Sequence, residues 1–229
     1  MELPTNDIAA PVQSIVSTPA PPIEPYYKDD RCTIYNADCR KVLPWLETFD
    51  LLLTDPPYGI GRDGSRPSTS KHGGRKAYEF KGWDCEPPPE YVLQMCIDSA
   101  NEQVVWGANY FPKVFDGSMG WLVWDKGQDI CSSDCELAFS SRQAALRRLV
   151  LNRVALQKDG TSHPTQKPLA LMKWCLGLFP EAVRIVDPFM GSGTTLVAAK
   201  GEGRQAVGIE LNEEYCEIAA KRLAQGVLF

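Results

Sequence analysis

The stretch VRIVDPFMGSGTTLVAAKGEG, residues 183–203, decides the fold of this chain. It begins with apolar and β-branched residues, which are typical of a buried strand, and ends with the helical spacing of a packed helix. Between the two halves, Gly191 and Gly193 allow a tight turn and a close approach of a ligand to the backbone. The stretch therefore predicts a strand, a glycine loop and a helix. Such units build α/β folds with parallel sheets.

The rest of the chain continues this alternation of strands and helices. Runs rich in Val, Ile, Leu and aromatic residues predict strands over 32–38, 49–55, 103–110, 120–126 and 205–212, with a weaker one over 135–141. Helical spacing predicts helices over 88–101, 167–179 and 212–226, and a short one over 40–47 that Pro44 interrupts. The pattern predicts an α/β fold with a mostly parallel, doubly wound sheet.

Length and composition predict one domain preceded by a tail. The chain has 229 residues, of which 44% are hydrophobic and 23% charged, as in ordinary globular proteins. Residues 1–30 are rich in Pro, Ser, Thr and Ala, so we expect a disordered tail there and an ordered domain over 31–229. Because we find neither a membrane-spanning apolar stretch nor a secretory signal, we expect a cytoplasmic protein that makes no membrane contact.

The cysteines and histidines do not predict a metal site. Eight cysteines are scattered without a CxxC pair, and His72 and His163 are the two histidines of the chain. A zinc site needs clustered ligands of these types, so we expect no metal and reduced thiols.

Two basic segments interrupt a chain whose net charge is −5. Residues 60–82 and 141–167 each carry a clear excess of Lys and Arg. They are either two solvated loops or, if they fold onto one face, a contact surface for a polyanion. The candidate DNA-contacting residues in them are Arg62, Lys71, Arg75, Lys76, Arg147, Arg148 and Arg153.

The segment TDPPYG, residues 54–59, follows the apolar run 51–53 and must end that strand, since proline cannot donate to a sheet. It leaves the carboxylate of Asp55, the carbonyl of Pro56 and the ring of Tyr58 at the strand tip. These groups suit a flat base with an exocyclic amino group, because two acceptors can hold the amino hydrogens while the ring stacks on the base. A base in a duplex would have to be flipped out to reach them. The alternative is a plain proline turn.

A second acid supports a nucleoside site near the glycine loop. Asp187 ends the strand before the loop, and Glu210 ends the next predicted strand. In Rossmann-like folds an acid at that second strand tip accepts hydrogen bonds from ribose hydroxyls. The alternative is a glycine-rich connection that binds nothing.

Four segments together carry a family resemblance: TDPPYG, HPTQKP (163–168), DPFMGSGTT (187–195) and VGIELNEEY (207–215). In this order they resemble the β class of S-adenosylmethionine-dependent DNA amino-methyltransferases. The segments IYNADC, WGANYF and WDKG are similar to small methylases of bacteriophages and prophages. The resemblance implies a Rossmann-like methyltransferase fold that is circularly permuted. It also implies a catalytic half at 31–127, a short target-recognition segment at 128–162 and a cofactor half at 163–229.

The resemblance also implies roles for individual residues. The catalytic residues would be Asp55, Pro56, Pro57 and Tyr58. The S-adenosylmethionine site would comprise Asp38, Thr165, Gln166, Lys167, Asp187, Phe189, Gly191, Gly193, Thr194 and Glu210. Within this set, Asp38 would lie near the adenine, Glu210 would bind the ribose, and residues 165–167 would hold the carboxylate end of the cofactor.

The function that the resemblance implies is methylation of double-stranded DNA at adenine N6. Cytosine N4 methylation is the close alternative, because both amines react by the same chemistry, and a non-catalytic DNA-binding module is the contrasting one. The short target-recognition segment leaves the recognition sequence open. A homodimer and a partner nuclease are left open as well.

Overall fold

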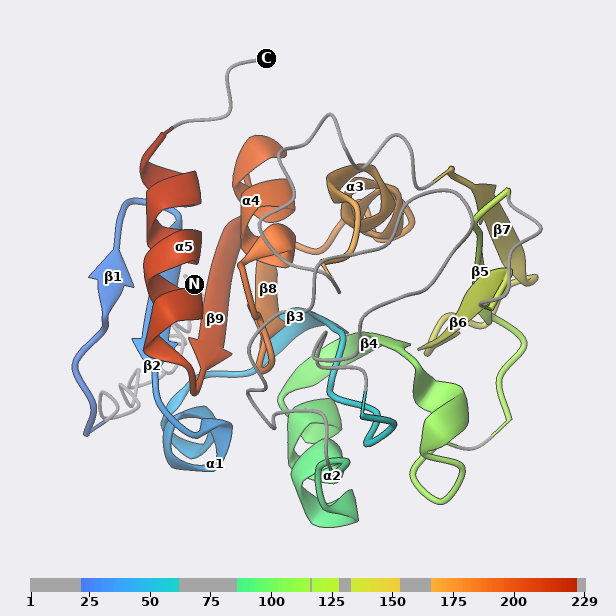
Figure 1. Ribbon diagram of the computed structural model, residues 1–229, viewed down its shortest axis with the longest axis horizontal. Coiled ribbons are helices and arrows are strands. Elements are labelled where there is room, and N and C mark those ends of the chain that lie inside the picture. The colour runs from blue at the N-terminus through green and yellow to red at the C-terminus, as the bar shows by residue number, and fades with distance from the viewer. Residues whose placement is uncertain (1–21, 62–85, 116, 128–132, 153–165, 226–229) are drawn as a thin grey trace, which may run out of the picture.

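The computed structural model describes residues 22–61, 86–115, 117–127, 133–152 and 166–225. Its centre is one sheet flanked by helices (Figure 1). The strands in the described ranges are β1 (Tyr27–Lys28), β2 (Cys32–Asn36), β3 (Phe49–Thr54), β4 (Ala100–Trp106), β5 (Leu122–Asp125), β6 (Cys135–Ser140), β7 (Arg147–Val150), β8 (Arg184–Asp187) and β9 (Gln205–Glu210). The α-helices there are α1 (Cys39–Val42), α2 (Glu90–Asp98), α3 (Leu169–Gly177), α4 (Thr194–Gly201) and α5 (Glu213–Ala224), and the short 3-10 helices are η1 (Leu43–Trp45) and η2 (Ala108–Tyr110).

The sheet has the order β1-β2-β9-β8-β3-β4-β6-β5-β7. Its five central strands, from β2 to β4, are all parallel to one another. The antiparallel strand β6 joins them to the parallel pair β5 and β7. This confirms the predicted α/β fold with a mostly parallel sheet. The C-terminal strands β8 and β9 lie between the N-terminal strands β2 and β3, as a circular permutation requires.

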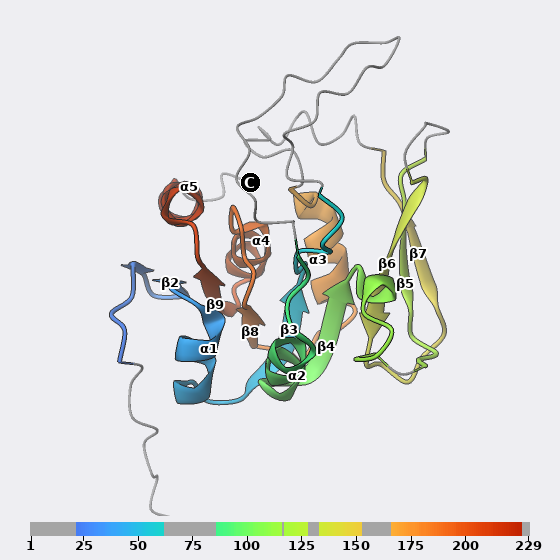
Figure 2. The same ribbon diagram turned by 60° about the horizontal axis from the view of Figure 1, so that its bottom comes forward.

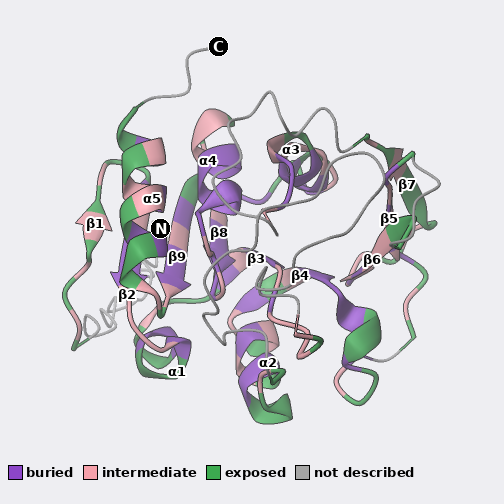
Figure 3. Ribbon diagram, viewed as in Figure 1, coloured by how far each residue is buried: buried purple, intermediate pink, exposed green. Residues whose placement is uncertain are grey.

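Helices cover both faces of the sheet, with α3, α4 and α5 on one face and α1 and α2 on the other (Figure 2). Neighbouring residues of the central strands therefore belong to different halves of the core. In β4, Val104 and Trp106 pack beneath the first group of helices and Val105 beneath the second. In β8, Ile185 and Val186 divide in the same way. Because both faces of the sheet are covered at these strands (Figure 3), their sequences are continuous apolar runs.

The chain leaves the ends of β3 and β8 in opposite directions. From β8 it continues through α4 to β9 on one side, and from β3 it continues through α2 to β4 on the other. In open α/β sheets, ligands bind outside the carboxyl ends of the strands at such a point. TDPPYG follows β3 and DPFMGSG follows β8, so the two motifs meet there.

The ordered domain begins earlier than predicted. Residues 27 and 28 form β1 and pair with β2, although the tail was expected to extend to residue 30. Asp29 holds this start in place, since its carboxylate accepts hydrogen bonds from the Cys32 amide at 2.7 Å and from Lys200 Nζ at 2.6 Å. Its buried setting alone would raise the pKa of Asp29, but these hydrogen bonds, led by that of Lys200, lower it to about 2.

Two further elements differ from the sequence prediction. The strand expected over 103–110 ends at Trp106, because Gly107 turns the chain with a φ of +70° and residues 108–110 form η2. The strand β7 lies inside the second basic segment and was not predicted. At the edge of the sheet its outward residues meet solvent, so Arg147 and Arg148 interrupt the apolar pattern of a strand.

Candidate active site

A hydrogen bond joins the two strand ends where the motifs meet. The Thr54 hydroxyl, at the end of β3, donates to Asp187 Oδ1 over 2.7 Å, and the Phe189 amide donates to the same oxygen over 3.2 Å. Burial raises the pKa of Asp187 to about 6, against the opposing effect of hydrogen bonds from Thr54 and Thr195. Asp187 thus holds the glycine loop to the catalytic strand.

Asp55 follows β3 directly, and both of its carboxylate oxygens have protein partners. Oδ1 accepts a hydrogen bond from the Tyr58 hydroxyl, and Oδ2 accepts one from Lys167 Nζ at 2.5 Å. Burial raises the pKa of Asp55, while the Lys167 ammonium acts in the opposite direction. A carboxylate oxygen has two lone pairs, so each oxygen can accept one further hydrogen bond.

Lys167 lies in this catalytic cluster. The resemblance implied that it would hold the carboxylate end of the cofactor. In the structure, Nζ contacts Asp55, the Tyr58 hydroxyl at 3.2 Å and Glu136 Oε2 at 3.2 Å. Burial alone would lower the pKa of Lys167, but the charge of Asp55, followed by those of Tyr58 and Glu136, raises it well above its usual value. In this structure Lys167 contacts Asp55, and its role at the carboxylate end of the cofactor stays a prediction.

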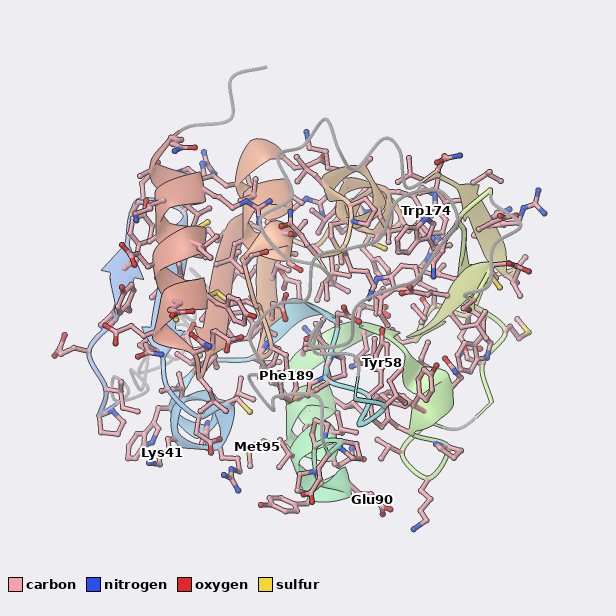
Figure 4. All side chains as sticks on the ribbon, viewed as in Figure 1. Lys41, Tyr58, Glu90, Met95, Trp174 and Phe189 are labelled. Carbon is pink, nitrogen blue, oxygen red and sulfur yellow. The ribbon has the colours of Figure 1, made fainter. Side chains whose placement is uncertain are left out.

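Tyr58 is held by the segment that follows β4. Its ring stacks on Tyr110, with 4.8 Å between the ring centroids and an interplanar angle of 13°, and meets Phe111 edge-on. Tyr110 is 46% exposed, so one side of this aromatic pair is open to solvent. Figure 4 labels Tyr58 and Phe189, which lie in the same part of the molecule near the ends of β3 and β8. The sequence pattern gave no role to Tyr110. The signal that could have found it is the aromatic pair Tyr110 and Phe111 shortly after Gly107.

The glycine loop leaves open space beside it. Gly191 has a φ of +50°, and no described atom lies within 4 Å of the position where a Cβ would stand. Gly193 has a different role, because a Cβ there would lie 2.7 Å from the Cβ of Ala219 in α5. One glycine thus keeps room for a ligand, and the other lets a helix pack closely.

Glu210 stands at the tip of β9 and faces the loop. Its carboxylate accepts hydrogen bonds from the Gly191 amide at 3.1 Å and the Asn212 amide at 2.8 Å. Burial raises the pKa of Glu210 against these hydrogen bonds. The carboxylate can still accept hydrogen bonds from hydroxyl groups of a ligand, because it has more lone pairs than these two amides use.

Arg222 of α5 holds the other side of the loop and was missed from the sequence. Its Nη1 donates to the Ser192 carbonyl at 2.6 Å and lies 3.2 Å from the Thr194 hydroxyl. In the sequence Arg222 was assigned to the last turn of a helix, where a basic residue is common. Because Arg222 is far along the chain from residues 191–194, the sequence pattern could not predict this contact.

Of the remaining predicted cofactor residues, Gln166 contacts this loop. The Ser192 hydroxyl donates to Gln166 Oε1 at 3.3 Å. Asp38 follows β2, the neighbour of β9, but its carboxylate caps α1 by accepting from the Arg40 amide and pairs with the Arg40 side chain. Thr165 lies outside the described residues.

The predicted DNA-contacting residues are only partly described. Arg147 and Arg148 lie on the exposed edge strand β7, and Arg148 Nη1 lies 3.6 Å from Asp125 Oδ2. Arg62, Lys71, Arg75, Lys76 and Arg153 lie outside the described residues. Within the described ranges, no cluster of three or more potential metal ligands occurs and no helix is long and apolar enough to cross a membrane.

The residues around the loop fit a nucleoside cofactor such as S-adenosylmethionine. Glu210 offers a carboxylate to ribose hydroxyls, and the space beside Gly191 allows a ligand to reach the backbone. The neighbouring Asp55 places an acceptor for an amino group on the adjacent strand end.

Comparison with known proteins identifies the same combination of features. Residues 106–221 match the family described as DNA methylase. The type II methyltransferase M.ScaI of Streptomyces caespitosus is 45% identical over an alignment that covers 87% of this chain and 84% of that enzyme. The crystal structure of the M1.HpyAVI–SAM complex aligns with a TM-score of 0.60 and 23% identity, covering 83% of this chain and 99% of that one. The cytosine-N4-specific PvuII DNA methyltransferase aligns with a TM-score of 0.58 and 16% identity, covering 88% and 89%.

Proposed function

Because the chain belongs to the N6/N4 DNA methylase family and its cofactor is S-adenosylmethionine, we propose that it methylates the N6 amino group of adenine in double-stranded DNA. The observation that carries the proposal is the position of Asp55, a buried carboxylate with spare acceptor capacity at the end of β3. The sequence D-P-P-Y favours adenine. We also infer that the enzyme works in the cytoplasm, where chromosomal DNA and the cofactor are present.

Asp55 and the carbonyl of Pro56 hold the target amino group. Each accepts one amino hydrogen, so the nitrogen lone pair is no longer shared with the ring and turns toward the methyl donor. Bound S-adenosylmethionine supplies the methyl group as an electrophile on a sulfonium sulfur. The nitrogen would form the new bond to this carbon as the carbon–sulfur bond breaks and S-adenosylhomocysteine leaves, and the amino group would then lose one hydrogen as a proton. Asp55 can accept that proton because burial raises its pKa.

Tyr58 supplies the stacking surface for the target base. One face of its ring is in contact with Tyr110, so the base either stacks on the other face or takes the place of Tyr110. A base must leave the duplex to reach this site, because Asp55 is only 25% exposed in its side chain. Base–aromatic stacking contributes about 1–3 kcal/mol in other nucleic-acid complexes.

Cytosine N4 methylation is the second candidate. The PvuII DNA methyltransferase, which has a similar fold, is specific for cytosine N4, and the chemistry described for Asp55 holds for both bases. The non-catalytic alternative is disfavoured, because Asp55, Tyr58 and Lys167 are all present and in mutual contact.

The deciding experiment is mass spectrometry of nucleosides from the DNA of cells that express the protein. We expect N6-methyldeoxyadenosine with the wild type and none with Asp55→Ala, which should still bind the cofactor. N4-methyldeoxycytidine would replace the adenine assignment and keep the mechanism. Unmodified DNA together with cofactor binding would support the non-catalytic module.

A further inference from the structure

A chain of alternating charges leads from Asp55 into the antiparallel part of the sheet. Lys167, just before α3, lies 2.5 Å from Asp55 Oδ2 and 3.2 Å from Glu136 Oε2 on β6. Glu136 Oε1 in turn lies 2.9 Å from Nζ of Lys126, which follows β5. The segments that follow β3 and β5, the strand β6 and the segment before α3 therefore contribute one residue each. The sequence motifs gave no function to Glu136 or Lys126.

The two lysines of the cluster are buried, its two carboxylates are half-buried, and its charges balance. The side chains of Lys126 and Lys167 are 4% and 8% exposed, and those of Glu136 and Asp55 are 26% and 25% exposed. A buried charge without a partner costs several kcal/mol, so each of these groups depends on its neighbours. Lys126 is fixed further by its hydrogen bond to the Ser133 carbonyl at 3.0 Å. It therefore anchors Glu136 in a position that faces Lys167.

Without a second carboxylate beside it, Lys167 would compete with the target amino group for the oxygens of Asp55. A single ammonium at 2.5 Å attracts the negative charge of Asp55, and the target amino group must compete for the same oxygens. Glu136 provides a second carboxylate for this ammonium. Glu136 offsets the charge of the Lys167 ammonium, so the negative charge of Asp55 stays available to the place where positive charge develops on the amine.

We propose that Glu136 is a positioning residue that acts through Lys167 and keeps Asp55 available to the target amino group. The inference rests on the proposed catalytic role of Asp55. It assigns the rate of methyl transfer in part to a residue that does not touch the substrate. Electrostatic groups preorganised around a developing charge act in this way in many enzymes.

The first test is the kinetics of Glu136→Gln. This variant removes the negative charge and nearly keeps the shape of the side chain. We expect kcat to fall about ten- to a hundredfold, with little change in KM for DNA or cofactor, because the effect arises in the chemical step.

The pH profile separates this role from a structural one. The charged or titratable groups around Asp55 are Lys167, Glu136, Tyr58 and Asp187. The charge of Glu136 raises the pKa of Asp55, so its removal lowers that pKa. The acid limb of the kcat profile should therefore move to lower pH in Glu136→Gln. A loss of packing alone would not move it.

Two further variants keep the test decisive. Glu102→Gln is the matched control, since Glu102 lies on the neighbouring strand β4 and accepts a hydrogen bond from Ser141, outside the cluster. It should keep the wild-type rate and profile. If Glu136→Gln does not fold, the double variant Lys126→Met/Glu136→Gln removes one opposite pair together and leaves no new unpaired charge. It should show the same fall in kcat and the same shift.

The outcomes test the positioning role of Glu136 separately from the catalytic role of Asp55 on which it rests. Wild-type kcat with an unmoved acid limb in the folded Glu136 variant would overturn the positioning role, provided that Asp55→Asn is inactive. Wild-type turnover in Asp55→Asn would instead reject the catalytic role of Asp55, and the inference would fail with it.

Discussion

Gly107 packs so closely against Tyr58 that a Cβ built on the glycine would lie 1.9 Å from Cε1 of the tyrosine. The glycine also has a φ of +70°, in the left-handed region that other residues rarely adopt. The segment after β4 thus determines where Tyr58 stands, with Gly107 beside its ring and Tyr110 stacked on it.

Gly107→Ala should displace Tyr58 and lower turnover at least about tenfold, because small displacements of positioning groups have large kinetic effects. Cofactor affinity should be nearly unchanged, since the glycine loop lies on another strand end. The measurement is single-turnover methylation together with calorimetry of cofactor binding. Gly177→Ala at the end of α3 is the control, because a Cβ there meets no described atom within 4 Å. Equal rates in both variants would contradict the close contact.

Arg222→Gln should weaken cofactor binding about tenfold or more. It removes a charged donor from the Ser192 carbonyl, and a hydrogen bond to a charged group contributes about 1.5–3 kcal/mol. Calorimetric titration with S-adenosylmethionine checks the prediction. Lys221→Gln is the neighbouring control, since Lys221 is exposed and pairs with Glu217 on the same helix. Unchanged cofactor affinity in Arg222→Gln would show that the glycine loop keeps its shape without the contact from Arg222.

Asp29→Asn should lower the free energy of unfolding by about 2 kcal/mol at neutral pH, because the carboxylate holds the start of the domain through hydrogen bonds to charged and backbone donors. The pKa of Asp29 is lowered to about 2, so this contribution is present above pH 4 and is lost as the pH falls toward 2. Urea unfolding at several pH values measures it. Asp30→Asn, at an exposed position, should behave as the wild type, as should a chain that lacks residues 1–21.

The contribution of Asp187 to the free energy of unfolding should depend on pH in the opposite sense to that of Asp29. Its pKa is raised to about 6 by burial, so the folded protein binds the proton more tightly than the unfolded chain does. Stability should therefore decrease by about 3 kcal/mol as the pH rises from 4 to 7, through this group alone. Asp187→Asn should lack this component while its side-chain oxygen still accepts from Thr54. The difference between the two unfolding curves, measured against pH, isolates the effect. Parallel curves would contradict it.

Arg147→Gln should weaken DNA binding and reduce the slope of log affinity against log salt by about one, if Arg147 contacts a phosphate. Arg147 lies on the exposed edge strand β7, far across the sheet from α1 (Figure 1). Lys41→Gln on α1 is therefore a suitable control, and cofactor affinity should not change in either variant. If both variants keep the wild-type slope, this part of the basic segment is only solvated surface.

Much of the fold followed from local patterns. The apolar runs at 32–38, 49–55 and 205–212 predicted central strands correctly, because such strands are buried on both faces of a parallel sheet. The helix predicted over 212–226 is α5, and Asn212 caps it by accepting a hydrogen bond from the Glu214 amide. Strands at the edges of the sheet were harder to predict from the sequence. β1 has two residues, and β7 carries arginines, so neither shows the apolar pattern of a central strand.

The sequence by itself determined the fold class and the strand ends at which its motifs lie, because periodicity, glycines and prolines act on neighbouring residues. The order of the two halves was implied by the family resemblance. Only the tertiary structure decided which side chains meet at those ends. Lys167 lies one residue from Gln166, yet the two side chains contact different loops. Arg222 reaches the glycine loop, and Glu136 reaches Lys167, from elements distant along the chain. Contacts of this kind depend on how helices and strands pack in space, and no local spacing in the sequence records that packing.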